Sequence, residues 1–266
     1  LIPPATVYAE RTRVTRSFFA LKRAFLELGI DIYNIGIALL RPRGTPRILA
    51  SDYWSHIAPI MSQLPRGELM LFDRGEALKA GIANLWHSRV RLYNFSSFSI
   101  RDRREARVET LKSFEKRWHD LRRNGLPEFL FNKVSLHQLI VEAFDDIFAY
   151  AVPRALCDID GAYALLKARA PDIVFLRASV SAQTHFYILA QVARACGIPS
   201  LELQHGLEYL GPGSLSKRHS TEYVAVYGRI VQDEFVALGF PREKIPIIGS
   251  PRFDSYKAKA DSIVEK

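Results

Sequence analysis

Two series of short apolar segments, each alternating with amphipathic segments of helical length, constrain the fold of this chain most. The first series follows Pro46 and contains the strand-like segments RILA, ELMLFD and RVRLYNF, separated by YWSHIAPIMSQL and EALKAGIANLWH. The second contains DIVFLRA, SLELQ, EYVAVYG and PIIGS, with THFYILAQVARACG and IVQDEFVALG as its helical segments. Short strands alternating with helices of about 10 to 13 residues indicate βαβ units. We therefore predict an α/β fold with a Rossmann-like parallel sheet.

The stretch between the two series is helical in character. Residues 101–124 intermix Arg and Lys with Glu105, Glu109, Glu115 and Asp120. Mixed charges of this kind favour an exposed helix supported by i,i+4 pairs over a nucleic-acid-binding stripe. Two further helices are predicted over about 135–150 and 159–169. We therefore expect one domain over residues 46–255, with a helical insertion at about 101–169.

The two ends of the chain are predicted to lie outside this domain. Residues 13–28 place apolar side chains at helical spacing before Gly29, which predicts an amphipathic helix with a glycine cap. Its small basic face favours a solvated surface over a membrane-docking one. Residues 1–45 are thus expected to form an N-terminal helical extension, and the polar residues 256–266 a linker.

The net charge of +9 and the pI near 9.6 predict attraction to polyanions, which include nucleic acids, anionic membrane surfaces and phosphorylated substrates. Acidic residues interleaved with the arginines argue against nucleic acid as the partner. Cys157 and Cys196 lie far apart, which favours a reducing cytoplasm over a disulfide framework or a zinc site. The apolar stretch Ile35 to Leu40 is far shorter than the roughly 20 residues that span a bilayer. We expect a cytoplasmic location, with peripheral contact at the inner face of the membrane as an option.

In open α/β sheets, ligands gather outside the carboxyl ends of the strands, so the loops that follow the predicted strands are the candidate sites. Gln204-His205-Gly206 follows the apolar segment Leu201 to Leu203. The glycine permits a tight turn that keeps the imidazole exposed. A structural histidine is the competing interpretation for this pair alone.

Two more strand ends carry polar groups. Ser55-His56-Ile57-Ala58-Pro59 lies at the first strand-to-helix turn, where we expect His56 to face the crevice. Pro59 also suits the first turn of any helix. Gly249-Ser250-Pro251-Arg252-Phe253-Asp254 follows the segment Ile245 to Ile248, and it suits either a structural hinge or a pair formed by Arg252 and Asp254.

In combination these motifs resemble a known family. The segment from residue 198 to residue 254 is similar to the His-Gly region of CDP-glycerol glycerophosphotransferases and related capsule and surface-polysaccharide transferases. That family has a strand ending in a His-Gly loop, then a strand and a helix, then a strand ending in a Gly-x-Pro-Arg-x-Asp turn. The Ser-His-x-x-Pro segment is similar to the turn that opens the first domain of many GT-B transferases. The resemblance implies the N-terminal, acceptor-side half of a GT-B fold.

The resemblance also implies roles for individual residues. His205 and His56 would be catalytic, with His205 as a general base or a phosphate contact; a general base typically contributes about 10² to 10⁴ in rate. The substrate-binding candidates are Gln204, Gly206, Ser55, Arg252 and Asp254. Gln204 and Leu207 stand where the glycerophosphotransferases tend to have Trp and Thr, which leaves the donor and the acceptor open.

The implied partners are a nucleotide-sugar or CDP-polyol donor and a glycan or lipid-linked acceptor. We expect no metal and no cofactor. The family holds the donor mainly on a second domain that begins after the Gly-x-Pro-Arg-x-Asp turn, so we expect a C-terminal nucleotide-binding domain to follow residue 266. The leading hypothesis is transfer of a sugar or polyol phosphate in surface-polysaccharide synthesis.

Two alternatives remain open at this point. A sugar-nucleotide epimerase of the same architecture would release free nucleoside diphosphate instead of glycosylating an acceptor, and product analysis would separate the two enzymes. A non-catalytic polyanion-binding module would instead bind generic DNA or RNA with a strong dependence on salt.

Overall fold

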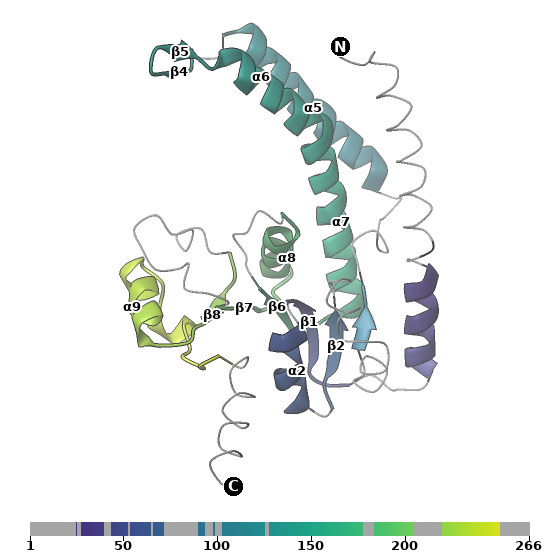
Figure 1. Cartoon of the computed structure of the whole chain (residues 1–266). Coiled ribbons are helices and arrows are strands. Elements are labelled where there is room, and N and C mark those ends of the chain that lie inside the picture. Colours follow the sequence, from purple (N-terminus) through teal and green to yellow (C-terminus); the bar gives the residue numbers. More distant parts are fainter. Residues whose placement is uncertain are drawn as a thin grey trace, which may run out of the picture.

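The computed structural model describes residues 28–39, 44–52, 54–64, 66–71, 90–93, 103–125, 128–177, 184–204 and 220–250, together with Phe25 and Phe98. Six parallel strands form its central sheet in the order β3-β2-β1-β6-β7-β8 (Figure 1). The strands are β1 (Arg47–Ser51), β2 (Glu68–Leu71), β3 (Val90–Leu92), β6 (Ile173–Leu176), β7 (Ser200–Leu203) and β8 (Tyr223–Ala225). The predicted Rossmann-like parallel sheet is confirmed.

The strand order reverses direction at the centre of the sheet. β1 pairs with β2 on one side and with β6 on the other, with Ile48 opposite both Leu69 and Ile173. The chain moves outward from β1 through β2 to β3, and later outward from β6 through β7 to β8. The boundary between β1 and β6 is therefore the topological switch point, where open α/β sheets bind their ligands.

Alternate residues of β1 face two different apolar layers. Leu49 belongs to a core cluster with Leu165 of α7 (Val152–Arg169) and Phe186 of α8 (Thr184–Ala195). Ile48 and Ala50 belong to the other cluster, with Ile57 of α2 (Trp54–Ser62). Helices on both faces explain why most residues of the strands are apolar, with buried charged residues at only a few positions such as Glu68, Arg91 and Glu202.

At one end of the sheet, α9 (Arg229–Ala237) packs beside β8, followed by a short 3-10 helix, η5 (Arg242–Lys244). The segment PIIGS was predicted as a further strand, and that prediction is wrong. It contributes one isolated parallel bridge, between Val226 and Ile247, in which the Val226 N–H donates to the Pro246 carbonyl oxygen and the Ile248 N–H donates to the Val226 carbonyl oxygen. The predicted helix at residues 76–87 lies outside the described residues.

The opposite edge of the sheet is covered by a helix over residues 28–39, which corrects the expected cap at Gly29. The helix continues through Gly29 because Ile30 and Ile37 are buried on the same face as Tyr33 and Asn34, which hydrogen-bond to β3. Asn34 Nδ2 donates to the Leu92 carbonyl oxygen at 2.6 Å, and the Leu92 N–H donates to Asn34 Oδ1 at 2.9 Å. The amide of Asn34 thus takes the place of a neighbouring strand.

A pair of long helices projects from the sheet, and we call residues 104–169 the helical arm (Figure 1). It consists of α5 (Arg104–Arg123), a hairpin of β4 (Leu130–Phe131) and β5 (Val134–Ser135), then α6 (His137–Asp146), the π-helical turn η3 (Ile147–Ala151) and α7. The two helices predicted after residue 135 are one continuous, bent helix. Pro153 falls at the start of α7, where the hydrogen-bonding pattern changes and its missing N–H is tolerated.

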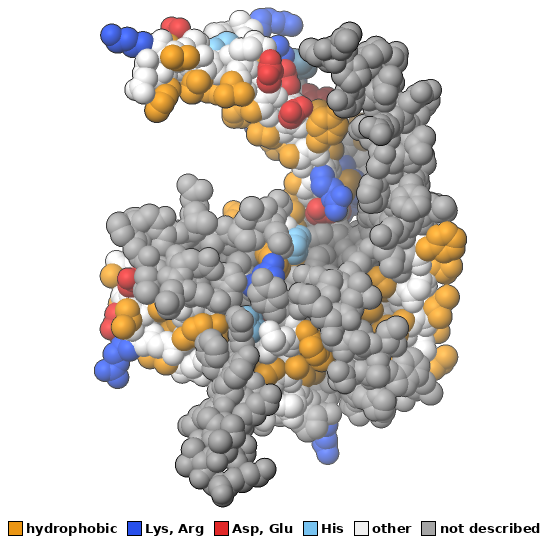
Figure 2. Space-filling view, viewed as in Figure 1, with side chains coloured by type: hydrophobic (Ala, Val, Ile, Leu, Met, Phe, Trp, Pro, Cys, Tyr) orange, Lys and Arg blue, Asp and Glu red, His pale blue; other side chains and the backbone are white. Residues whose placement is uncertain are grey.

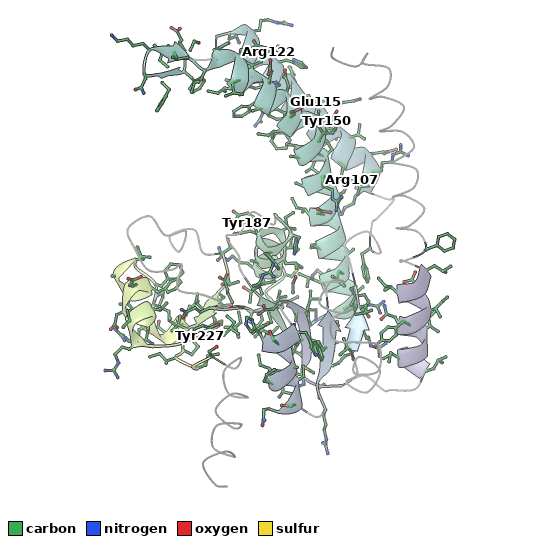
Figure 3. The ribbon with its side chains drawn as sticks, in the orientation of Figure 1. Arg107, Glu115, Arg122, Tyr150, Tyr187 and Tyr227 are labelled. Carbon is green, nitrogen blue, oxygen red and sulfur yellow. The ribbon has the colours of Figure 1, made fainter. Side chains whose placement is uncertain are left out.

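The arm is held together by contacts across it. Trp118 is buried and stacks on Phe144 and Phe148, while its Nε1–H donates to Asp145 Oδ1 at 2.7 Å. Arg107 Nη1 lies 2.7 Å from Asp160 Oδ2 of α7 (Figure 3). The ion pairs recorded for α5 therefore run to the neighbouring helix, whereas the sequence suggested i,i+4 pairs along α5. Within the described residues, no helix combines the length and the apolar character needed to cross a bilayer.

Candidate functional site

The carboxyl ends of β1, β6, β7 and β8 lie at the same edge of the sheet because these strands are parallel. Polar side chains are buried there: Ser51 and Asp52 at the end of β1, and Gln204 directly after β7, are at most 1% exposed. Buried polar groups carry more information about a site than buried apolar ones, because each must be compensated. The edge predicted from the strand-end motifs therefore does hold a set of buried polar groups.

Asp52 and His56 form a buried pair across the turn from β1 into α2. Asp52 Oδ1 lies 3.1 Å from His56 Nδ1, and the side chains are 0% and 1% exposed. α2 begins at Trp54, so the Asp52 carboxylate lies near the amino terminus of the helix, where the backbone dipoles favour negative charge. A carboxylate at Nδ1 favours the tautomer with the proton on that nitrogen, which places the lone pair of the ring on Nε2.

On the other side of the switch point, β6 ends in a cationic residue. The Arg177 N–H donates to the Ser51 carbonyl oxygen at 3.0 Å, which extends the ladder between β6 and β1 by one bond. The Arg177 guanidinium lies over the ring of Phe186 in α8, 5.2 Å from its centroid. Neighbouring strands are about 4.8 Å apart, so the histidine–carboxylate pair and the arginine follow adjacent strand ends.

Gln204 holds the end of β7 against the turn after β8. Its N–H donates to the Ala225 carbonyl oxygen at 2.9 Å, and its Oε1 accepts the N–H of Tyr227 at 2.8 Å. Tyr227 is labelled in Figure 3. Because the side chain of Gln204 is 0% exposed, it fixes the point from which the chain continues into His205. Its contact with a substrate stays a prediction.

The structure places some of the predicted site residues and leaves others undescribed. Ser55 and His56 both lie in the first turn of α2, with Ser55 exposed and His56 enclosed. The remaining candidates lie outside the described residues: His205, Gly206, Arg252 and Asp254.

Sequence reasoning missed Asp52 and Arg177. Asp52 could have been found by a simple signal, since it is the first charged residue after the predicted strand RILA; Arg177 lies inside the predicted segment DIVFLRA, directly after its apolar residues. The sequence also gave no indication that the histidine in the first helical turn would be paired with a carboxylate four residues earlier.

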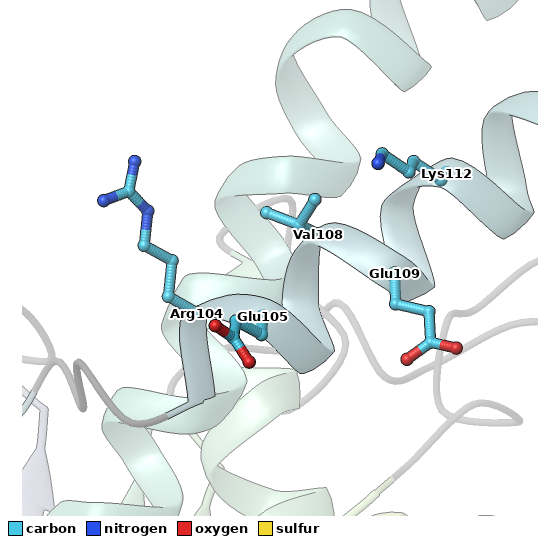
Figure 4. Close-up of a pocket in the computed structure, with 5 residues that line it drawn as sticks. All are labelled: Arg104, Glu105, Val108, Glu109 and Lys112. Carbon is cyan, nitrogen blue, oxygen red and sulfur yellow. The ribbon is translucent and has the colours of Figure 1, made fainter.

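A hollow of about 440 Å³ lies away from the strand ends, along the first turns of α5 (Figure 4). Its described lining residues all belong to this one helix: Arg104, Glu105, Val108, Glu109 and Lys112. Charges of both signs alternate there, so the hollow shows no preference for an anionic or a cationic ligand.

No protein-family model matches the chain. No curated protein matches its sequence. Among solved structures, the UDP-GlcNAc 2-epimerase of Neisseria meningitidis bound to UDP-GlcNAc is similar at 10% identity and a TM-score of 0.45, over 82% of this chain and 49% of that one. The UDP-GlcNAc 2-epimerase of Methanocaldococcus jannaschii is similar at 12% identity and a TM-score of 0.43, over 78% and 46% of the two chains.

A third similar structure is Anabaena HepE in complex with UDP and glucose, at 13% identity and a TM-score of 0.37, over 77% of this chain and 44% of that one. The chain thus spans about half the length of the solved structures that it resembles. Two of the three are sugar-nucleotide epimerases, the class of enzyme that the sequence left open as an alternative. None of the three is named as a CDP-glycerol glycerophosphotransferase. At these identities the likeness concerns the course of the backbone and assigns no substrate.

Proposed function

We propose that this chain is the N-terminal part of a GT-B-type enzyme that acts on a nucleotide-activated sugar or polyol, with Asp52 and His56 as its proton-transferring pair. The observation that carries the proposal is the enclosed contact between Asp52 and His56 beside the switch point of the sheet. In a parallel α/β sheet this is the place at which ligands bind.

The pair has the composition that general-base catalysis requires. The Asp52 carboxylate orients the imidazole through Nδ1 and stabilises the imidazolium that forms when Nε2 takes a proton. Arg177, at the adjacent strand end, offers a cation that suits a phosphate oxygen of the substrate. The resemblance to the His-Gly region keeps His205, which follows Gln204 in the sequence, as a second candidate base.

In the transfer reaction, the hydroxyl of a glycan or lipid-linked acceptor gives its proton to His56 or His205. The acceptor oxygen then forms a bond to the transferred sugar or polyol phosphate. The bond to the nucleotide breaks, and the nucleotide leaves with the bonding electron pair. The histidine that took the proton later gives it to the departing nucleotide or to water, so the enzyme is unchanged at the end of the cycle.

The alternative reaction on the same substrate class is epimerisation, in which the base takes a proton from a carbon of the sugar and no acceptor is needed. Two of the similar structures are UDP-GlcNAc 2-epimerases, which supports this alternative. Release of nucleotide that depends on an added acceptor would identify a transferase. Conversion of the sugar in the absence of any acceptor would identify an epimerase.

The test uses the full-length protein with UDP-GlcNAc and CDP-glycerol as donors, each with and without a glycan acceptor, and follows products by mass spectrometry. We expect His56→Gln to lower turnover by about 10² to 10⁴. His119→Gln is the matched control, because His119 is exposed on α5, far along the chain from the strand ends. Equal turnover of both variants and the unmodified protein, with unchanged circular dichroism, would remove His56 from the mechanism.

A further inference from the structure

We propose that the end of the helical arm docks on an anionic phospholipid bilayer. We call residues 122–139 the arm tip; its apolar side chains would enter the interfacial region while its basic residues contact the lipid headgroups. This inference goes beyond the proposed reaction and does not depend on it, because the arm tip is separate in sequence and in place from the strand ends (Figure 1).

The arm tip is built around a tight two-residue hairpin. Phe131 pairs with Val134 and Leu130 with Ser135, in antiparallel register. The turn residues Asn132 and Lys133 have φ angles of 49° and 67°, so both adopt the left-handed conformation that a type I′ hairpin turn requires. The Leu136 N–H extends the pairing by donating to the Phe129 carbonyl oxygen at 2.7 Å.

The side chains of this hairpin are apolar yet face outward. Leu130 is 58% exposed, Phe131 66% and Val134 62%, and Leu139 at the start of α6 is 64% exposed. A two-stranded hairpin is at best marginally stable in water on its own. Contiguous exposed apolar residues on a soluble protein mark a surface that contacts something else. Figure 2 shows hydrophobic side chains gathered at this end of the arm.

The charges around the apolar residues favour an anionic partner. Residues 122–137 contain the basic residues Arg122, Arg123 and Lys133 and a single acidic residue, Glu128. Arg122 Nη1 donates to Asp145 Oδ2 of α6 at 3.0 Å, so Arg123 and Lys133 are the cations that we assign to the headgroups. Lys133 occupies the turn itself, between Phe131 and Val134, and the whole chain has a net charge of +9. Apolar side chains flanked by Lys and Arg are typical of segments that lie in the interface of an anionic membrane.

The geometry of the arm suits such contact. The continuous helix from His137 to Arg169 would be about 50 Å long if straight, at 1.5 Å per residue, and it separates the hairpin from the sheet. Docking through the arm tip would therefore leave the strand ends of β1, β6 and β7 accessible. An enzyme held in this way could meet a substrate that is itself attached to the membrane.

The experiment measures cosedimentation of the full-length protein with vesicles made of equal parts phosphatidylglycerol and phosphatidylcholine, and with vesicles of phosphatidylcholine alone. We expect binding to the mixed vesicles and much weaker binding to the neutral ones. Replacing two apolar residues in Leu130→Ser/Phe131→Ser should weaken binding at least tenfold. Lys133→Glu should weaken binding to the anionic vesicles about tenfold, because it exchanges an attractive charge for a repulsive one.

The matched control is Tyr150→Ser. Tyr150 is 66% exposed, as Phe131 is, but it lies on η3 along the arm and outside the arm tip (Figure 3). Its variant should bind vesicles as the unmodified protein does. Circular dichroism and hydrogen exchange of α5 and α6 verify that each variant keeps its arm folded.

Three results would overturn the proposal. The first is vesicle binding that the double variant does not reduce, and the second is an equal loss in Tyr150→Ser. The third is a dimer in light scattering that the double variant dissociates, since it would assign the hairpin to contact with a second copy. A folded double variant that binds tenfold more weakly, beside a normal Tyr150→Ser, would support docking through the arm tip.

Discussion

Asp52 and His56 are four residues apart in sequence, and the short turn between β1 and α2 brings Asp52 Oδ1 to 3.1 Å from His56 Nδ1. The distance is that of a hydrogen bond, and both side chains are enclosed. A histidine on a helix face is most often explained by packing alone. Here the Asp52 carboxylate favours the tautomer of His56 with its proton on Nδ1. The pair also lies beside the topological switch point of the sheet.

Asp52→Asn tests whether the carboxylate acts through the imidazole. The asparagine keeps the shape but loses the charge that would stabilise an imidazolium, so we expect turnover to fall by at least about 10². The free energy of unfolding should fall by about 1 to 3 kcal/mol, because a buried polar contact is weakened. The measurements are steady-state kinetics of the full-length protein and urea unfolding.

The double variant Asp52→Asn/His56→Gln tests whether the two residues act together in catalysis. If the two residues act as one unit, the double variant should be no slower than the slower single variant. Strictly multiplicative losses in turnover would show that each residue acts separately, and the pair would then be a structural contact.

At the β3 edge of the sheet, the side chain of Asn34 pairs with both backbone groups of Leu92. Asn34→Ala removes both the donor to the Leu92 carbonyl and the acceptor for the Leu92 N–H. We expect the free energy of unfolding to fall by about 1 to 3 kcal/mol in urea titrations, since both backbone groups of Leu92 lose a partner. Asp31→Ala on the same helix is the control and should stay within about 0.5 kcal/mol, because Asp31 is exposed. Equal effects of the two variants would rule out the strand-mimicking role.

Tyr33 should make stability depend on pH in the alkaline range. Burial raises the pKa of the Tyr33 phenol from 10.0 to about 12, an effect that Arg91 partly opposes. Between these two pH values the unfolded chain loses the phenol proton while the folded chain keeps it. The free energy of unfolding should therefore fall as pH rises through this window, with the full contribution present below pH 10.

Tyr33→Phe provides the comparison for this pH dependence. The variant has no phenol to ionise, so its stability should decline less steeply than that of the unmodified protein across the same window. It should also be less stable at neutral pH, because the hydroxyl donates to the Val90 carbonyl oxygen at 3.0 Å. Parallel pH profiles from urea unfolding would exclude Tyr33 as the titrating group.

Trp118→Ala should loosen the arm without unfolding the sheet. Trp118 is 4% exposed, stacks on Phe144 and Phe148, and donates to Asp145. Replacing such a buried tryptophan typically costs about 3 to 5 kcal/mol. Because its contacts lie within the arm, we expect faster amide exchange in α5 and α6 and unchanged exchange in β1 and β6. A uniform loss of protection across the chain would instead show that the arm and the sheet unfold together.

The sequence was sufficient for the architecture of the sheet. The strands β1, β2, β6 and β7 coincide with apolar segments that alternate with amphipathic ones, and hydrophobic periodicity is a local property that a sequence displays directly. The sequence was insufficient to predict where the helix over residues 28–39 begins and ends, because a glycine cap and a continuing helix were both compatible with the local pattern. Gly29 looked like a cap, yet the contacts of Ile30 and Ile37 with the rest of the protein continue the helix past it.

For the candidate site, too, some features could be predicted from the sequence and others depend on the tertiary structure. The sequence by itself determined that His56 and Gln204 follow strands, because a strand and the turn after it are adjacent in the chain. Only the tertiary structure decided that the ends of β1 and β6 are neighbours, since strand order depends on how the connecting helices pack on the sheet. It likewise decided that Asp52 is enclosed with His56, and that the hairpin around Lys133 stands apart at the end of a long arm, because burial and separation are properties of the packed chain.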